Sequence, residues 1–100
     1  MILLLPLNCS DAEEARLVPI LEATQWATVD IEEGRVREIN FYAERSETDA
    51  WLDAVVVVND FEPVMEFIEQ QMMVLVAHTQ RSIDDIVEAY LFRELHQLAF

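Results

Sequence analysis

Three apolar runs of the chain each end in polar side chains, and these side chains include the best metal ligands in the sequence. Cys9 follows the run "ILLLPL" (residues 2–7), and His78 follows the run "MVLVA" (residues 73–77). A thiolate and an imidazole are ligands that transition metals and iron–sulfur clusters use in proteins. We therefore predict a metal or cluster site in which Cys9 and His78 are the ligands. The other residues of the predicted cofactor-binding set are Asn8, Asn59 and Asp60.

The same side chains also have a structural interpretation. Asn8, Asp60 and Thr79 are residue types that cap the first turn of a helix, and an isolated cysteine often packs as a small hydrophobic residue. His78 would then be a turn residue. One cysteine and one histidine without a fixed spacing do not form a recognised metal motif. The residues alone therefore leave both interpretations open, as metal ligands or as cap, core and turn residues.

The three apolar runs predict strands that are covered on both faces of a sheet. Residues 2–7, 54–58 and 73–77 are continuous aliphatic segments of strand length. Such segments are typical of parallel strands between two layers of helices. A helix is expected after Pro63, because proline is tolerated in a first helical turn and Val64, Phe67 and Ile68 follow at helical spacing.

The clearest helical pattern begins at Ser82, which is a suitable N-cap residue. Asp84 and Asp85 are favourable in the positively polarised first turn. The apolar residues that recur at helical spacing are Ile83, Ile86, Val87, Tyr90, Leu91, Leu95 and Leu98. The pattern predicts one helix that runs to the end of the chain and carries His96 near its C-terminus.

Between the first two apolar runs, the sequence predicts a hairpin and two shorter helices. Residues 26–32 and 36–44 alternate in the manner of half-exposed strands, and Gly34 between them can take the positive φ of a tight turn. Residues 10–22 form a capping-box pattern that predicts a helix, which Pro19 shortens or kinks. A further short helix is expected after Thr48, including Trp51 and Leu52.

The composition predicts a single cytoplasmic domain over residues 1–100. Twenty acidic residues against six basic ones give a net charge of −14, which opposes binding to nucleic acid or to an acidic membrane surface. A single cysteine excludes an internal disulfide, in keeping with a reducing compartment. The N-terminal apolar run lacks the features of a signal peptide, and no run has the length of a membrane helix.

Three segments of the sequence resemble the dinitrogenase iron–molybdenum cofactor biosynthesis family. They are "MILLLPL" at the start, the hairpin "VDIEEGRVREINF" and the last helix "SIDDIVEAYLFREL". The similarity covers nearly the whole chain. The strands alternate with helices, which predicts an α/β fold with a five-stranded mixed sheet and helices on both faces. The resemblance implies a ribonuclease H-like motif with strand order 3-2-1-4-5.

The resemblance implies a non-enzymatic carrier or accessory domain for an iron–sulfur or iron–molybdenum cofactor. In an open α/β sheet, ligands bind beyond the carboxyl ends of the parallel strands, where the predicted cofactor-binding residues lie. Family members have glycines after the fourth strand, where this chain has Asn59, Asp60 and Phe61, and a glycine–isoleucine pair where it has Met72 and Met73. The alternative is therefore a divergent member that has lost the cofactor and acts as a protein–protein interaction or structural module, for example as a homodimer. No catalytic motif is present, and we expect no enzyme activity.

Overall fold

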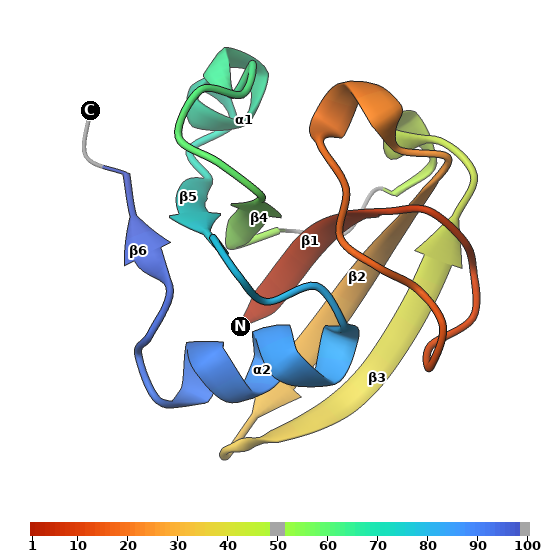
Figure 1. Cartoon of the computed structure of the whole chain (residues 1–100), viewed down its shortest axis with the longest axis vertical. Helices are drawn as coiled ribbons and strands as arrows, with labels where there is room; N and C mark the ends of the chain where they lie inside the picture. Colours follow the sequence, from red (N-terminus) through yellow and green to blue (C-terminus); the bar gives the residue numbers. More distant parts are fainter. Residues whose placement is uncertain (49–51, 99–100) are drawn as a thin grey trace.

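The computed structural model describes residues 1–48 and 52–98, and this part of the chain forms a mixed sheet of six strands with order β3-β2-β1-β4-β5-β6 (Figure 1). The strands are β1 (Ile2–Leu7), β2 (Gln25–Glu32), β3 (Arg35–Tyr42), β4 (Ala54–Val57), β5 (Met73–Val76) and β6 (His96–Gln97). The helices are α1 (Met65–Glu69) and α2 (Ile83–Leu91), with single 3₁₀ turns η1 (Ile20–Glu22) and η2 (Arg45–Glu47).

The predicted strand order 3-2-1-4-5 is confirmed, and β6 extends it at one edge. Strand β1 pairs in parallel with β4, and β4 pairs in parallel with β5. Strands β2 and β3 are antiparallel to their neighbours, as expected for a hairpin beside a parallel core. The chain therefore has the α/β architecture that its alternating strands and helices predict.

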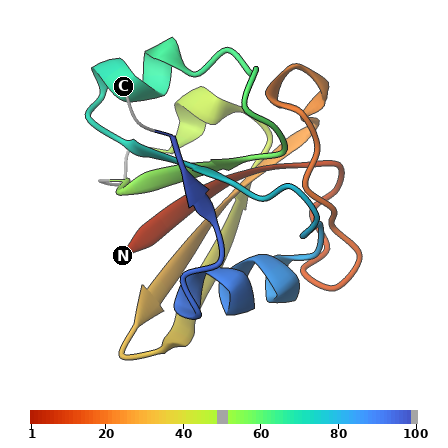
Figure 2. The same cartoon turned by 60° about the vertical axis from the view of Figure 1, so that its left-hand side comes forward.

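The two helices lie on opposite faces of the sheet, as predicted (Figure 2). Alternate residues of a strand point to opposite faces. Accordingly, Leu3 and Leu5 pack in a hydrophobic cluster with Ile83 of α2, whereas Leu4 packs in a second cluster with Phe67 of α1. Within the described residues, neither α1 nor α2 has the length and apolar character needed to cross a membrane.

The β2–β3 hairpin forms around Gly34, whose φ of 79° places it in the left-handed region. Glu33 before it also has a positive φ, so both central residues of the turn have the sign that a tight hairpin favours. The register shifts between Asp30 and Ile31, which marks a bulge on the exposed edge of the sheet. Such bulges bend an edge strand and hinder pairing with another chain.

The helix predicted over residues 10–22 is wrong. The side chain of Asp11 accepts hydrogen bonds from the backbone N–H groups of Glu13 and Glu14, which closes one local turn. Beyond it the chain is extended, and the N–H of Leu17 donates to the carbonyl of Arg81. These contacts satisfy the backbone without a helix, and only the 3₁₀ turn η1 follows.

The C-terminal end of the last predicted helix also differs. Helix α2 begins after Ser82 as predicted, with the Ser82 hydroxyl accepting from the N–H of Asp85, but it ends at Leu91. Arg93 has a φ of 57°, and the chain turns back into β6, so Leu95 and Leu98 lie outside the helix. The helix predicted after Thr48 falls mainly on residues 49–51, outside the described residues, and Leu52 is not helical.

One carboxylate joins two loops that are far apart in the sequence. Glu62 accepts hydrogen bonds from the backbone N–H of Ile20 and from that of Val58, the latter at 2.7 Å. The first belongs to η1 and the second follows β4, so the side chain connects two segments at the same end of the sheet. Without Glu62, both partly buried N–H groups would lose their acceptor.

We expect the substitution Glu62→Ala to lower the free energy of unfolding by about 2 kcal/mol, because two donors lose a charged acceptor. Urea denaturation followed by circular dichroism measures the difference. The matched control is Glu69→Ala, because Glu69 is exposed on α1 and its carboxylate makes no hydrogen bond within the described residues. Equal stability of the two variants would contradict the structural role of Glu62.

Candidate functional site

The candidate site lies at the carboxyl ends of the parallel strands. Because β1, β4 and β5 run in the same direction, the segments that follow them emerge at one edge of the sheet. These segments contain Asn8, Asp60 and His78, as the sequence predicts. In open α/β sheets this edge is where ligands bind.

His78 and Asp60 are in direct contact across this edge. The Nε2 atom of His78 lies 2.7 Å from Oδ1 of Asp60, and their side chains are 55% and 41% exposed. The loop that contains His78 is held by Arg81, whose guanidinium donates to the carbonyl oxygens of Ala77, His78 and Gln80. The imidazole is therefore oriented by a carboxylate and remains accessible to solvent.

Asn8 and Asn59 form hydrogen bonds that stabilise turns. Oδ1 of Asn8 accepts from the backbone N–H of Arg16 at 2.9 Å, which positions the loop after β1. Oδ1 of Asn59 accepts from the N–H of Phe61 at 2.8 Å, which closes the turn before α1. Both amide oxygens have a structural partner, and the cofactor contacts predicted for these two residues stay a prediction.

Cys9 does not share the environment of His78. Its side chain is partly buried and packs against the hydrophobic cluster under α2. In the described residues, no group of three or more His, Cys, Asp or Glu side chains is arranged to hold a metal ion. Of the predicted cofactor-binding set, the structure therefore brings together Asp60 and His78.

The sequence pattern missed the second imidazole at this edge. It placed His96 at the end of the last helix, but the structure places it in β6, opposite Val76 of β5. The ring centres of His78 and His96 lie 6.2 Å apart. No glycine or proline marks the end of α2 in the sequence, so no local signal could have indicated that the chain turns back here.

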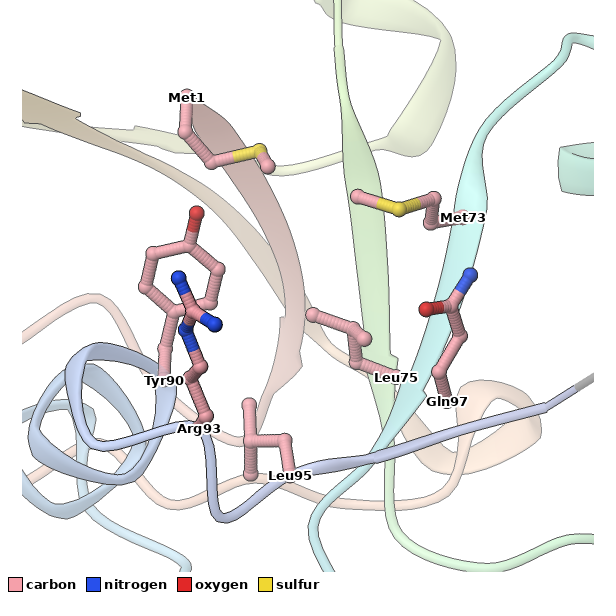
Figure 3. Close-up of a pocket in the computed structure, with 7 residues that line it drawn as sticks. All are labelled: Met1, Met73, Leu75, Tyr90, Arg93, Leu95 and Gln97. Atoms are coloured by element: carbon pink, nitrogen blue, oxygen red, sulfur yellow. The ribbon is translucent and has the colours of Figure 1, made fainter.

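A separate pocket of about 270 Å³ lies on the α2 face of the sheet, near the first residues of β1 and β5 (Figure 3). Its lining residues are Met1, Met73, Leu75, Tyr90, Arg93, Leu95 and Gln97. Figure 3 shows Tyr90 and Arg93 on one side and Met73 and Gln97 on the other. The lining contains no carboxylate, its polar groups come from Tyr90, Arg93 and Gln97, and its mostly apolar wall suits an apolar group.

The tip of the β2–β3 hairpin has a shallow hollow with paired charges. Arg37 lies 3.1 Å from the carboxylate of Glu32 and 3.8 Å from that of Asp30. The hydrogen bond to Glu32 raises the pKa of the Arg37 guanidinium above its ordinary value, and the charges of Glu32 and Asp30 add to this effect. Such exposed ion pairs belong to a solvated turn and contribute little stability.

Several solved chains share this fold, and two of them are described below. The crystal structure of PH0822 matches 98% of this chain and 96% of its own, with a TM-score of 0.78 and 15% sequence identity. A protein of Methanocaldococcus jannaschii, described as a "putative dinitrogenase", matches 99% of this chain and 95% of its own, with a TM-score of 0.76 and 12% identity. No protein-family model and no curated protein matches the sequence. At these identities, the similarity shows a common fold.

The exposure of the His78–Asp60 contact gives a prediction for stability. We expect Asp60→Ala and His78→Ala each to change the free energy of unfolding by less than about 1 kcal/mol, because exposed ion pairs contribute little. Urea denaturation measures both variants beside the unmodified protein. A loss well above this value in either variant would show that the contact is part of the structural framework rather than an accessible surface feature.

Proposed function

We propose that this protein is a non-enzymatic accessory domain that carries a metal–sulfur cofactor, of the iron–sulfur or iron–molybdenum type, as cargo. The observation that supports the proposal is the contact between His78 and Asp60 at the carboxyl edge of the sheet. The fold it shares with the protein described as a "putative dinitrogenase" and the sequence resemblance agree with it. A cytoplasmic location belongs to the same proposal.

The donor set fits a transient carrier better than a protein with a permanently enclosed cluster. Imidazole is a suitable ligand for iron, and a metal-binding histidine commonly has its other ring nitrogen bonded to a carboxylate. His78 has this arrangement with Asp60. Since the described residues contain no group of three donors, the sulfide and other ligands of the cargo have to fill the remaining coordination positions. Because the protein supplies only a small number of ligands, release of the cargo to the next protein would be favoured.

Cys9 and His78 are not equally well placed to bind the metal of the cargo. His78 is exposed and oriented, whereas Cys9 is partly buried and packs against the hydrophobic cluster under α2. The proposal therefore depends on the imidazole first, with Cys9 as a second ligand. Separate replacements of the two residues distinguish these roles.

The test is to purify the protein without oxygen, offer it ferrous iron and sulfide, and measure metal content, sulfide content and visible absorption. We expect stoichiometric uptake that His78→Ala reduces by most of its value and Cys9→Ala reduces less. Thr79→Ala is the matched control, because Thr79 is the exposed neighbour of His78. Full uptake by His78→Ala would exclude His78 as the ligand and contradict the proposal.

A second function, binding of a protein partner, is favoured by a specific observation at the same end of the sheet. Leu21 and Phe61 are 85% and 93% exposed, although both are large apolar side chains. They lie on the two loops that Glu62 joins, next to Ile20 and to Glu62 itself. Exposed apolar side chains that gather on one surface often mark a site of protein interaction.

The charge of the molecule favours a basic partner over a second copy. Asp60, Glu62 and Glu22 adjoin the two apolar residues in sequence, and the whole chain has a net charge of −14. Two identical chains with this charge repel one another, whereas a basic amphipathic segment is attracted. We therefore propose a partner whose binding face combines basic and apolar residues, with a homodimer as the competing outcome.

Binding of a basic amphipathic peptide, measured by fluorescence anisotropy, tests this second function. We expect Phe61→Ser to weaken binding at least about tenfold, because exposed aromatic anchors dominate such interfaces. Phe92→Ser is the matched control, because Phe92 is 71% exposed at the end of α2. Equal binding by the two variants would contradict the assignment of Phe61 to the binding surface. If the protein instead dimerises at high concentration and Phe61→Ser prevents this, the partner is a second copy of the chain rather than a basic segment.

A further inference from the structure

The two histidines of the chain lie beside one another although 17 residues separate them in the sequence. His96 pairs with Val76 in the β5–β6 ladder, and His78 follows Val76 by two residues. Diagonal neighbours across an antiparallel pair share a face of the sheet. The two rings consequently have centres 6.2 Å apart and planes inclined by 33°.

The hydrogen bond to Asp60 determines which nitrogen of His78 is available. In a neutral imidazole, one ring nitrogen donates a proton and the other has a free lone pair. When Nε2–H of His78 donates to Asp60, the lone pair is on Nδ1. The ring of His96 is exposed and makes no hydrogen bond within the described residues. Both histidines can therefore offer a nitrogen to the same ligand.

We propose that His78 and His96 bind a single divalent transition-metal ion, such as Zn²⁺ or Ni²⁺, with Asp60 orienting His78. These ions favour imidazole nitrogen, and the carboxylate–histidine–metal arrangement is common around them. The site goes beyond the proposed carrier function, because a single ion requires no sulfide and because His96 has no part in that proposal. Water molecules fill the remaining coordination positions.

The observed separation of the rings is compatible with one ion between them. An ion about 2.1 Å from one nitrogen of each ring keeps the ring centres roughly 5–6 Å apart. Both side chains are exposed, so each ring is free to change its rotamer when an ion binds. The loop of His78 is already held in place by Arg81, which limits the ordering that metal binding requires.

The charge of the molecule favours a cation at this edge. A net charge of −14 raises the concentration of divalent cations near the protein surface. Carboxylates alone would attract many ions weakly and without a fixed position. Two imidazoles are what distinguish this place from the rest of the acidic surface, so dependence on the histidines is the property to be tested.

Isothermal titration calorimetry with NiCl₂ and with ZnCl₂, on the full chain without iron or sulfide, tests the inference. We expect one ion per chain. His78→Gln and His96→Gln should each weaken binding at least about tenfold, and Asp60→Asn should weaken it about tenfold as an orienting residue. The matched control is Gln97→Ala, the neighbour of His96 in β6, which should bind as the unmodified protein does. Circular dichroism verifies that each variant is folded.

The results separate this inference from the carrier function. The site would be overturned if His96→Gln bound the ion with unchanged affinity. It would also be overturned if several ions bound weakly and neither histidine affected their binding, because this would indicate association with surface carboxylates. Broadening of the His78 and His96 ring signals by Ni²⁺ in NMR spectra would support it. The carrier test uses iron and sulfide and depends on His78, whereas His96 matters for the single-ion site alone. A His96→Gln protein that takes up clusters normally but no longer binds Ni²⁺ would therefore confirm this site independently of the carrier function.

Discussion

Strands β1, β4 and β5 are buried on both faces, and the arrangement of the other elements follows from this requirement. Leu3, Leu4 and Val56 have no exposed surface, and alternate residues of each strand belong to different hydrophobic clusters. A strand of this kind is stable only between two covering layers, because either face left open would expose a row of aliphatic side chains to water. Helix α1 supplies one layer and α2 supplies the other.

This double burial also determines where polar chemistry is available. The strands themselves have no room for unpaired polar groups, so the side chains that can bind a ligand lie where the strands end. Parallel pairing brings the ends of β4 and β5 to one edge, and the contact between Asp60 and His78 results. The position of the candidate site thus follows from the direction of the buried strands.

The two outer edges of the sheet are closed in different ways. Strand β3 has a bulge opposite Asp30 and Ile31 and charged side chains such as Arg37, which hinder pairing with another chain. Strand β6 is only two residues long, and it covers the edge of β5. The short strand β6 therefore covers the edge of β5 and also brings His96 next to His78.

Elements whose signals are local could be predicted from the order of the residues. Continuous aliphatic runs predicted the three central strands, Gly34 predicted the hairpin, and Ser82 predicted the start of α2, all of which the structure confirms. The order 3-2-1-4-5 could be anticipated from the resemblance and from the preference of such strands for parallel pairing. Apolar periodicity and capping act within a few residues, so they can be recognised without tertiary contacts.

Other features depend on contacts between residues that are distant in the sequence, so local patterns could not predict them. The capping-box pattern after Ser10 was overridden by hydrogen bonds from Arg16 to Asn8 and from Leu17 to Arg81, which keep that segment extended. The last apolar stripe continued past Leu91 in the sequence, yet the chain turned at Arg93 so that β6 could pair with β5. Long-range pairing of the backbone outweighed local helical preference, and that pairing placed His96 beside His78.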